Sequence, residues 1–423
     1  MLPTPEIKAL QRLQIQNGLL INAERWMKSH EYHRQRQNIH YQSLNQPGII
    51  CGLGVSLIEA PKDIPSQYND GRWLQIQPGI AIDVAGNPII VAEPIDFHIA
   101  ADIADTQPRL IYIVLSYVDP DKLVRQQTSE FEKETFRIDE KTSPPTAFEV
   151  EVCQILLQPG LVALGNPTDV FFPGVNCLDL RSRKIACSRP KAFVRVASLQ
   201  SSTPEVTNSI ANLSYLLQAT NSLYPSLQGY EKIDKLTWTH LENATIGNTY
   251  DLLFTTGNQI IQLNEKELSN LKIYLDKGGV LLIESPTNAV DRLESIIDLT
   301  DQLGTPLEDL RRQSRNHPLR SQPFLFAGLP RDTNQQPIQL LTAGGIILTI
   351  GDLSAAWGLD DKLSLPRETI RTAQELGINI LNFAWQRRQM TQLMQQQTNK
   401  ESSQESSQEL SKEPLKNILK KLE

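Results

Sequence analysis

Residues 249–284 read TYDLLFTTGNQIIQLNEKELSNLKIYLDKGGVLLIE, and this stretch decides the fold class of the second half of the chain. Its two apolar runs, TYDLLFT and VLLIE, are typical of buried strands. Asn264 with Glu267 three residues later is the pattern of a capping box at a helix start, and Gly278-Gly279 is typical of a helix end. Two strands joined by a helix predict a parallel sheet that helices cover on both faces.

The same alternation extends on both sides of this stretch, so residues 191–390 are predicted to form one α/β domain. Its other elements are expected as strands at residues 193–199 and 345–350 and as helices at residues 206–220, 291–303 and 370–388. At 423 residues the chain is too long for one ordinary core, which also predicts several domains.

The first half has a different pattern. Residues 1–48 predict a helical segment, with a break near Asn17-Gly18 and Asn22 as the N-cap of the second part. Residues 49–190 predict a β-rich domain with long loops, because apolar residues alternate around turn sequences. Strands are expected at residues 110–118 and 148–157, and the charged segment 119–145, which contains Pro144-Pro145, is predicted to be a long loop.

The C-terminal end is low in complexity. Residues 391–411 contain a glutamine run and a Glu-Ser-Ser-Gln repeat, so we predict a flexible linker. Residues 412–423 predict a short amphipathic helix with an apolar stripe at i, i+3, i+4 and i+7 and with lysines outside it. The stripe consists of Leu415, Ile418, Leu419 and Leu422, and the lysines are Lys416, Lys420 and Lys421.

Three partners are open for this tail helix: the groove of another protein, a membrane surface, or its own domain. Residues 412–423 contain four lysines and two glutamates, a local net charge of +2. That is a mild charge for binding anionic lipid, where several basic residues act together. A protein partner is therefore favoured over a membrane.

Composition excludes some classes of protein. The formal net charge is −7, whereas a nucleic-acid-binding protein usually presents a basic face. No apolar run approaches the length of a membrane-spanning helix, and the N-terminus has no signal-peptide pattern. We expect a cytoplasmic protein that binds no nucleic acid.

Cysteines and histidines are the candidates for a metal site. Cys51, Cys153, Cys177 and Cys187 form no CxxC pair, so reduced, mostly buried thiols are expected. On the N-terminal helix, His33 and His40 are seven residues apart and His30 lies one turn before His33. Such spacing is a weak metal signature, and surface or interface histidines are the favoured interpretation. No metal is expected.

Five short segments of the first half carry a resemblance. They are Gln16-Asn17-Gly18-Leu19-Leu20, Tyr32-His33-Arg34-Gln35-Arg36, Pro47-Gly48-Ile49-Ile50-Cys51-Gly52-Leu53, Pro78-Gly79-Ile80-Ala81-Ile82-Asp83 and Gly86-Asn87-Pro88. With these residues the first half resembles the opening domain of baseplate-associated proteins in phage-tail-like contractile injection systems. Such proteins are assembly parts, so the resemblance implies a structural role.

The second half carries another resemblance through Asp251–Gly257, Leu263–Leu268, Leu275–Leu281 and Gly377–Leu381. It resembles an uncharacterised bacterial domain similar to the class I glutamine amidotransferase-like and ThuA-like folds. Amidotransferases place a cysteine on a tight strand-to-helix turn, whereas the turn here contains Ser285 followed by Pro286 and every cysteine lies earlier in the chain. Ser285 with His317 is the remaining nucleophile–base pair, and nothing in the sequence brings the two together.

We therefore expect an α+β multidomain protein, with an N-terminal helix and an antiparallel β-rich domain followed by a flavodoxin-like or amidotransferase-like α/β domain with a mostly parallel sheet. The resemblances imply a non-enzymatic structural component at or near a baseplate, without catalytic residues or cofactors. It would be particle-associated and bind other baseplate and tail proteins, in several copies of a symmetric assembly. Peripheral membrane contact through the tail helix stays open.

Two other functions also stay open. One is a hydrolase or amidotransferase-like enzyme that uses the α/β domain. The other is a ligand- or receptor-binding module of the same machine, for which clustered exposed aromatic residues are typical. Aromatic residues make up only 6% of the chain, and Trp357 and Trp385 are predicted to pack in the last part of the α/β domain.

Overall fold

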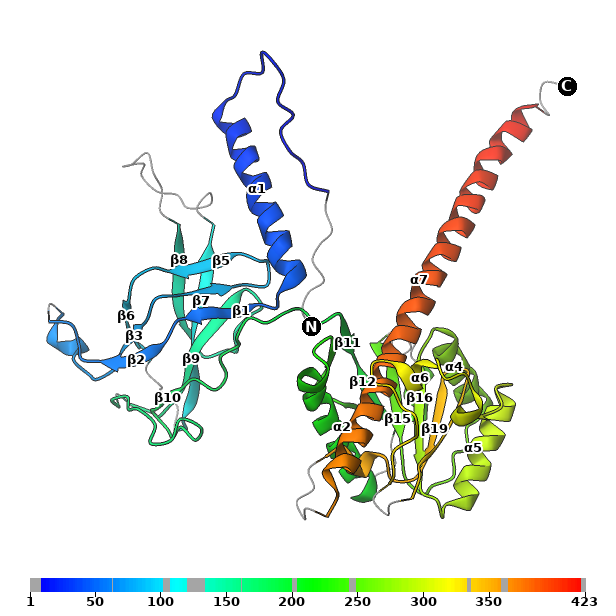
Figure 1. Cartoon of the computed structure of the whole chain (residues 1–423). Coiled ribbons are helices and arrows are strands. Elements are labelled where there is room, and N and C mark those ends of the chain that lie inside the picture. Colours follow the sequence, from blue (N-terminus) through cyan, green and yellow to red (C-terminus); the bar gives the residue numbers. More distant parts are fainter. Residues whose placement is uncertain are drawn as a thin grey trace. The chain divides into compact units, whose positions relative to one another are not determined.

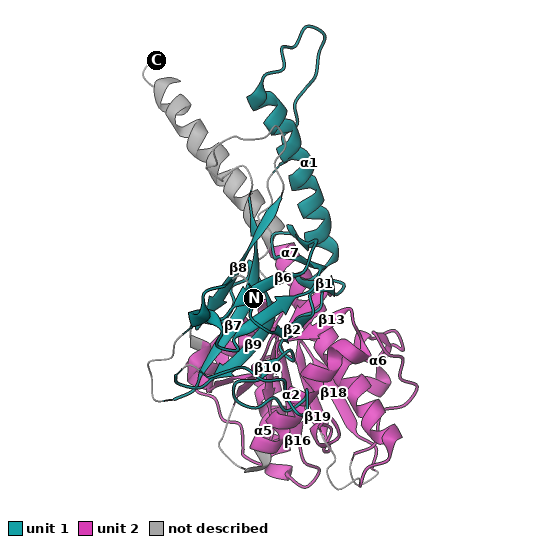
Figure 2. Cartoon of the chain, turned by 90° about the vertical axis from the view of Figure 1, so that its left-hand side faces the viewer, with its two compact units in different colours: residues 1–189 teal, residues 190–423 magenta. Residues whose placement is uncertain are grey.

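The computed structural model describes residues 9–62, 64–101, 107–119, 134–160, 162–199, 204–242, 249–332, 336–358 and 364–419, with the last side chain at Gln395. Figure 1 shows the elements along the chain. The chain forms two compact units, residues 1–189 and residues 190–423, which Figure 2 colours separately. The predicted fold class is confirmed: an N-terminal helix and antiparallel sheets are followed by a mixed sheet with helices.

The described part of unit 1 begins with an arm, residues 9–21, that contains no helix or strand, and continues with helix α1, Ala23–Leu44. The Asn22 side chain accepts a hydrogen bond from the Arg25 N–H at 3.0 Å, which confirms the predicted N-cap. The described residues before Asn22 are not helical, so the prediction of helix there was wrong. Gly18 has a φ of +85° in a turn closed by the Leu19 N–H on the Gln16 carbonyl, and this turn separates the arm from α1.

Three antiparallel sheets share one core in unit 1. The strands are β1 (Gly48–Gly52), β4 (Gly79–Ile82) and β5 (Pro88–Val91) in the first sheet; β2 (Val55–Ile58), β3 (Trp73–Ile76) and β6 (Ile95–His98) in the second; and β7 (Arg109–Val118), β8 (Thr135–Lys141), β9 (Glu149–Leu157) and β10 (Leu178–Asp179) in the third. Alternate residues such as Ile111 and Ile113 of β7 and Val152 of β9 point into the common core.

Strand β8 corrects the prediction of a loop over residues 119–145. It pairs with β7 from Tyr112 opposite Lys141 to Val118 opposite Thr135. The apolar residues Phe136 and Ile138 alternate with charged ones and pack against the core, which is the two-residue period of a strand with one solvated face. Residues 120–133 of the predicted loop lie outside the described residues.

Unit 2 contains a seven-stranded sheet in the order β14-β12-β15-β16-β19-β18-β17. The first five strands are parallel to one another. At one edge β18 pairs antiparallel with β19, and β17 pairs antiparallel with β18. The bounds are β12 Val196–Leu199, β14 Asp234–Leu236, β15 Leu252–Thr255, β16 Val280–Ser285, β17 Glu308–Asp309, β18 Gln339–Ala343 and β19 Ile346–Ile350. In chain order, the parallel strands follow the 2-1-3-4-5 arrangement of flavodoxin-like sheets.

Helices cover both faces of this sheet. Alternate strand residues divide the core: Phe254 and Leu282 pack with α2 (Pro204–Leu223), the short α6 (Pro318–Ser321) and α7 (Arg367–Leu419). Leu253 and Ile283 pack on the other side with α4 (Glu265–Asp276) and α5 (Val290–Gln302). The predicted capping box is present at the start of α4, and Gly278 after its end has a φ of +89°.

Several elements of unit 2 differ from the sequence prediction. The strand expected at residues 193–199 is two strands, β11 (Ala192–Val194), which pairs with β13 (Leu227–Gly229), and β12. They are interrupted at Arg195, whose N–H donates to the Asp251 carboxylate at 2.8 Å. Helix α7 runs through residues 391–411, for which the sequence predicts a flexible linker; no Gly or Pro lies between Gly377 and Pro414 to end it.

The described helices include none that is long and apolar enough to cross a membrane.

Candidate functional site

A polar pocket lies at the carboxyl ends of the parallel strands of unit 2. The segments after β15, β16 and β19 meet there with α2, and the space between them is about 220 Å³. The lining residues with polar side chains are Ser209, Thr256, Asn258, Gln259, Glu284, Asp352 and Ser354. In open α/β sheets this edge is where ligands commonly bind. This makes the pocket the first candidate site.

Glu284 is the buried centre of this pocket. One carboxylate oxygen accepts a hydrogen bond from the Ser354 N–H at 2.7 Å. The other accepts from the Ser354 hydroxyl at 2.6 Å and from the Thr256 hydroxyl at 3.1 Å. Burial raises the pKa of Glu284 above its ordinary value, although these hydrogen bonds act in the opposite direction. The carboxylate thus holds the segments after β15 and β19 in place.

Arg292 of α5 lies close to the pocket wall. Its side chain is buried, and one terminal nitrogen donates to the Gln259 carbonyl at 2.6 Å. Its Nε and other terminal nitrogen have no partner among the described residues. Burial lowers the pKa of Arg292 to about 10, and the charge of Glu284 acts against that shift.

Ser285 and His317, the sequence's remaining nucleophile–base pair, have separate partners. The buried Ser285 hydroxyl has a long 3.4 Å contact to the Pro286 carbonyl. His317 is the N-cap of α6, where its Nδ1 accepts from the Leu319 N–H at 3.3 Å. Its ring packs beside Phe383 of α7. Each side chain therefore has a partner elsewhere, and no hydrogen bond joins Ser285 to His317.

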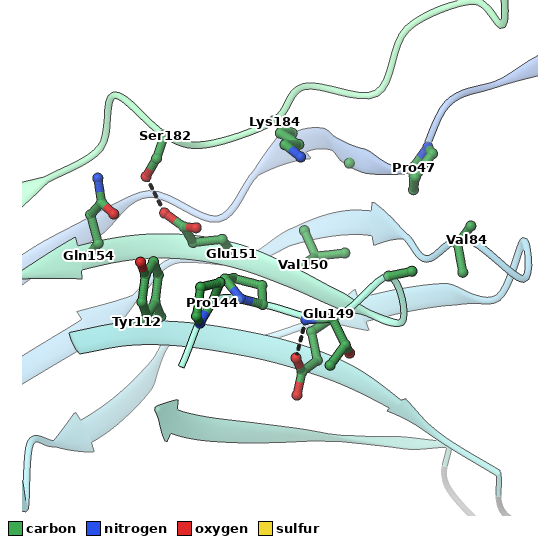
Figure 3. A pocket seen from close by; sticks show the side chains of 14 residues that line it. Pro47, Val84, Tyr112, Pro144, Glu149, Val150, Glu151, Gln154, Ser182 and Lys184 are labelled. Carbon is green, nitrogen blue, oxygen red and sulfur yellow. Dashed lines mark hydrogen bonds between the residues drawn. The ribbon is translucent and has the colours of Figure 1, made fainter. Parts of the chain in front are cut away.

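A cavity of about 540 Å³ lies in unit 1, between the start of β1, the turn before β9 and the segment after β10 (Figure 3). Figure 3 shows Pro47, Pro144 and Val150 around it. Polar side chains are already engaged at its wall: Ser182 bonds Glu151, and Glu149 accepts from the Thr146 N–H at 2.6 Å. Glu149 also pairs with Lys141, and these bonds hold its pKa below the ordinary value despite burial.

An aromatic loop, which we define as residues 169–175 (Asp-Val-Phe-Phe-Pro-Gly-Val), lies between β9 and β10. Val170, Phe171 and Phe172 are 66, 70 and 78% exposed. The loop is nevertheless ordered by hydrogen bonds: the Phe171 N–H donates to the Asp169 carboxylate at 2.8 Å, and the Phe172 N–H donates to the Asp169 carbonyl. Sequence reasoning missed this loop, although three adjacent large apolar residues in a Pro/Gly-rich segment were its signal.

Arg181 anchors the aromatic loop from the end of β10. Its guanidinium donates to the Phe171 carbonyl at 3.0 Å and forms two hydrogen bonds with Asp179, at 3.0 and 2.8 Å. The bonds from Arg181 hold the pKa of Asp179 below its ordinary value. Asp179 also accepts from Gln154 of β9. These hydrogen bonds tie the loop to β9 and β10.

The remaining residues that the sequence singled out are the cysteines, the candidate metal ligands and Trp357. All four cysteines are free, but only Cys153 is buried, and Cys51 and Cys187 are exposed, so the prediction of mostly buried thiols was wrong. Within the described ranges no three His, Cys, Asp or Glu side chains are grouped as metal ligands. Trp357 is buried as predicted and donates to the Ala373 carbonyl at 2.9 Å.

The tail-helix residues fall beyond the described side chains. Leu415, Lys416, Ile418 and Leu419 belong to the backbone span of α7, and Lys420, Lys421 and Leu422 lie outside the described residues. The predicted amphipathic stripe therefore stays a prediction.

Comparisons with known proteins give one family match and a distant structural similarity. Residues 197–385 match the model of a family described as a domain of unknown function (DUF4159), and this match falls within unit 2. No curated protein matches the chain. Among solved structures, the crystal structure of TssK is similar with 10% sequence identity and a TM-score of 0.26, over 63% of this chain and 54% of that chain. The chain therefore spans about half the length of TssK.

Proposed function

We propose that this protein is a non-enzymatic structural component at or near the baseplate of a contractile injection system, where it mediates assembly or anchoring. The observation that carries the proposal is the aromatic loop of unit 1. Large apolar side chains that stay exposed in a contiguous group mark interaction sites in soluble proteins. The sequence resemblance of unit 1 to baseplate-associated proteins supplies the class of partner.

The aromatic loop has the properties of a preformed contact. Phe171 and Phe172 offer large apolar surfaces, and aromatic side chains lose little conformational entropy on binding. The bonds from Asp169 and Arg181 fix the backbone beneath them before any partner arrives. A fixed loop avoids the ordering cost that a flexible one would incur on association. Burying both rings would therefore contribute strongly to a docking contact.

The segments that carry the resemblance support the same role. Residues 47–53 and 78–83 form β1 and β4, which pair antiparallel with Cys51 opposite Ile80. Ile90 of β5 lies opposite Ile80 in the next strand. Ile50, Cys51 and Ile90 are exposed on this small sheet. Some residues of the segments that carry the resemblance, such as Ile50 and Cys51, thus lie at the surface. A contact with another protein requires residues in such a position.

Unit 2 supports the non-enzymatic part of the proposal. Ser285 is buried and His317 caps a helix, so the nucleophile that the fold would use is not paired with this base. The proposed function gives unit 2 a binding or spacing role on the particle. The tail-helix residues, Leu415 to Leu422, would reach a neighbouring protein or a membrane surface from there.

The experiment is a pull-down of the tagged full chain from its native cell, with electron microscopy of the eluate. Contractile particles with this chain at the baseplate end are the expected result. The double variant Phe171→Ser/Phe172→Ser should lose the particles, because aromatic hot spots contribute about 2 kcal/mol or more each when they are buried. Phe148→Ser is the matched control: Phe148 is 58% exposed in the same unit but lies outside the aromatic loop.

The results of the pull-down and its control distinguish a role of this protein in particle assembly from other roles. An unassembled wild-type chain would overturn the proposal and would favour a ligand or substrate for the pocket of unit 2. Equal loss in the Phe148→Ser control would show that surface apolarity in general, and not the aromatic loop, causes particle binding. Liposome flotation of the full chain against a truncation at Gln392 separates the two partners of the tail helix: a membrane contact requires that only the full chain floats.

A further inference from the structure

The polar pocket of unit 2 lies at the point where the strand order of its sheet reverses. Strand β12 leads through α2 to β14 on one side, and β15 lies on the other side of β12. The pocket takes Ser209 from α2 and residues 256–259 from the segment after β15. In open α/β sheets, ligands bind at this switch point, outside the carboxyl ends of the strands. The position of the pocket therefore favours a ligand, and its side chains select the kind.

Two hydroxyl groups of the pocket have their hydrogen atoms engaged by the chain itself. Ser354 and Thr256 both line the pocket, and their hydroxyls donate to the Glu284 carboxylate at 2.6 and 3.1 Å. A hydroxyl has one hydrogen to donate and two lone pairs that accept. With both hydrogens engaged, the two oxygens can only accept hydrogen bonds from a ligand. Glu284 thus makes this part of the lining a set of acceptors.

The charges that line the pocket are negative. Its described lining residues include the carboxylates of Glu284 and Asp352 and no Lys, Arg or His. The two carboxylates interact: burial is the main cause that raises the pKa of Glu284, and the charge of Asp352 adds to it. The buried Arg292 acts on Glu284 in the opposite sense, but it is not a lining residue. A ligand in the pocket would therefore meet acceptors and negative charge.

This lining disfavours two classes of ligand. An anion, such as a phosphate or a carboxylate, would meet two carboxylates without a cation beside it. A large apolar ligand would find only Gly257, Pro286 and Ala355 as apolar neighbours among the described lining residues. The volume of about 220 Å³ also limits size, because a water molecule occupies about 30 Å³ and sites for drug-sized ligands have roughly 300–1,000 Å³. A small molecule that is rich in donors and carries no negative charge remains.

We propose that this pocket binds a small molecule through a primary ammonium group. The inference goes beyond the proposed baseplate role and does not rest on it.

An ammonium group matches the pocket better than a neutral alcohol does. It has three N–H donors and a positive charge, whereas an alcohol has one donor for each oxygen and no charge. The acceptors that the pocket offers are the Ser354 and Thr256 oxygens and the Asp352 carboxylate. The exposed side chains of Asn258 and Gln259 supply both donors and acceptors for the rest of the ligand. Because Glu284 already holds Ser354 and Thr256, these acceptors need little ordering when a ligand binds.

The test compares three probes of nearly equal size that differ in charge: ethanolamine, ethylene glycol and glycolate. Each is added to the full chain, and binding is followed by NMR of the backbone amides. The Ser354 amide, which donates to Glu284 at 2.7 Å, and the Gly257 amide report from within the pocket. Ethanolamine should shift both signals in a saturable way. Ethylene glycol should bind roughly tenfold more weakly and glycolate should not bind, because only the ammonium is attracted by the carboxylates.

Two variants locate the binding. Asp352→Asn keeps the shape of the side chain and removes its charge, so the affinity for ethanolamine should fall roughly tenfold. Asp298→Asn is the matched control, because Asp298 is an exposed carboxylate of α5 that does not line the pocket. Ala355→Leu, at an exposed lining position, should fill the pocket and remove binding without taking away a polar group. The circular dichroism spectra of all three should stay those of the folded chain.

Several results would overturn the inference. They are equal binding of ethanolamine and ethylene glycol, preferred binding of glycolate, and no saturable shift with any probe. Unchanged ethanolamine affinity in both Asp352→Asn and Ala355→Leu would do the same, because it would place the binding elsewhere. Ethanolamine binding by a chain that joins no particle would leave the inference standing and would contradict only the proposed function.

Discussion

Ser354 donates two hydrogen bonds to Glu284, from its backbone N–H at 2.7 Å and from its hydroxyl at 2.6 Å. Glu284 lies in β16, and Ser354 begins the short helix η5 (Ser354–Ala356) after β19. The carboxylate therefore joins the ends of two neighbouring strands at the edge where the polar pocket opens. The Glu284 carboxylate thus adds to the backbone pairing of β16 with β19 and to the apolar packing of Leu353 and Trp357.

Glu284→Ala should destabilise the chain. The substitution leaves the Ser354 N–H and the Thr256 hydroxyl without their acceptor, and unpaired buried polar groups cost roughly 1–3 kcal/mol. We expect the free energy of unfolding to fall by about 2–3 kcal/mol. Urea unfolding followed by circular dichroism measures this. An unchanged unfolding midpoint would show that water replaces the carboxylate without loss.

Glu284→Gln should change the pH dependence of stability. Burial raises the pKa of Glu284 in the folded chain, so the folded chain favours the protonated form more than the unfolded chain does. Its contribution to stability is complete below the ordinary carboxylate pKa and is lost as pH rises through the folded pKa. Glutamine does not titrate, so the variant should lose less stability than the wild type as pH rises above about 4.5. An equal loss of stability in the two proteins over this rise in pH would contradict the prediction.

Asn264→Ala should weaken α4 at its start. The Asn264 side chain accepts from the Glu267 N–H at 2.9 Å, and the Glu267 side chain accepts from the Asn264 N–H at 3.0 Å. Loss of such a cap costs about 1 kcal/mol. Urea unfolding should show this loss. Ser269→Ala, at an exposed position within the same helix, is the control and should be neutral or slightly stabilising, because alanine favours helix.

The sequence predicted the elements whose signals are local. Asn264 and Glu267 make their cap within four residues, and the apolar runs of β15 and β16 are long enough to identify strands. Strands such as β14 and β17 are two or three residues long and depend on their neighbours in the sheet for their conformation. Strand β8 was predicted as loop because its charged residues hide the period of Phe136 and Ile138. Such elements follow from tertiary pairing rather than from local sequence.

For the candidate sites, too, local features were predictable from the sequence and long-range contacts were not. The sequence shows that no cysteine lies at the turn after β16, and it gives little reason to pair Ser285 with His317. The pairing of Glu284 with Ser354 was not predictable, because seventy residues separate them and only the strand order brings them together.

Gly86→Ala should loosen α1 from the β-rich part of unit 1. Gly86 has a φ of +80°, and a Cβ there would lie 2.4 Å from the Asn38 carbonyl oxygen of α1. Backbone strain and this clash should together lower the free energy of unfolding by about 1–3 kcal/mol. Limited proteolysis should also cut α1 faster. Gly160→Ala is the control, because Gly160 has a φ of +85° with no atom within 4 Å and so tests the strain alone.

Arg181→Ala should release the aromatic loop without unfolding unit 1. Arg181 is exposed, but its guanidinium is the group that joins the Phe171 carbonyl to the Asp179 carboxylate. Without it, Phe171 and Phe172 would have to be ordered on binding, so particle association should weaken roughly threefold to tenfold while the melting temperature changes little. Hydrogen exchange at the Phe171 and Phe172 amides, which measures local opening, should become faster. Arg137→Ala, an exposed arginine of β8 that lies 4.0 Å from Asp139, is the control and should change neither measurement. Slow exchange in the Arg181 variant would mean that Asp169 alone holds the loop.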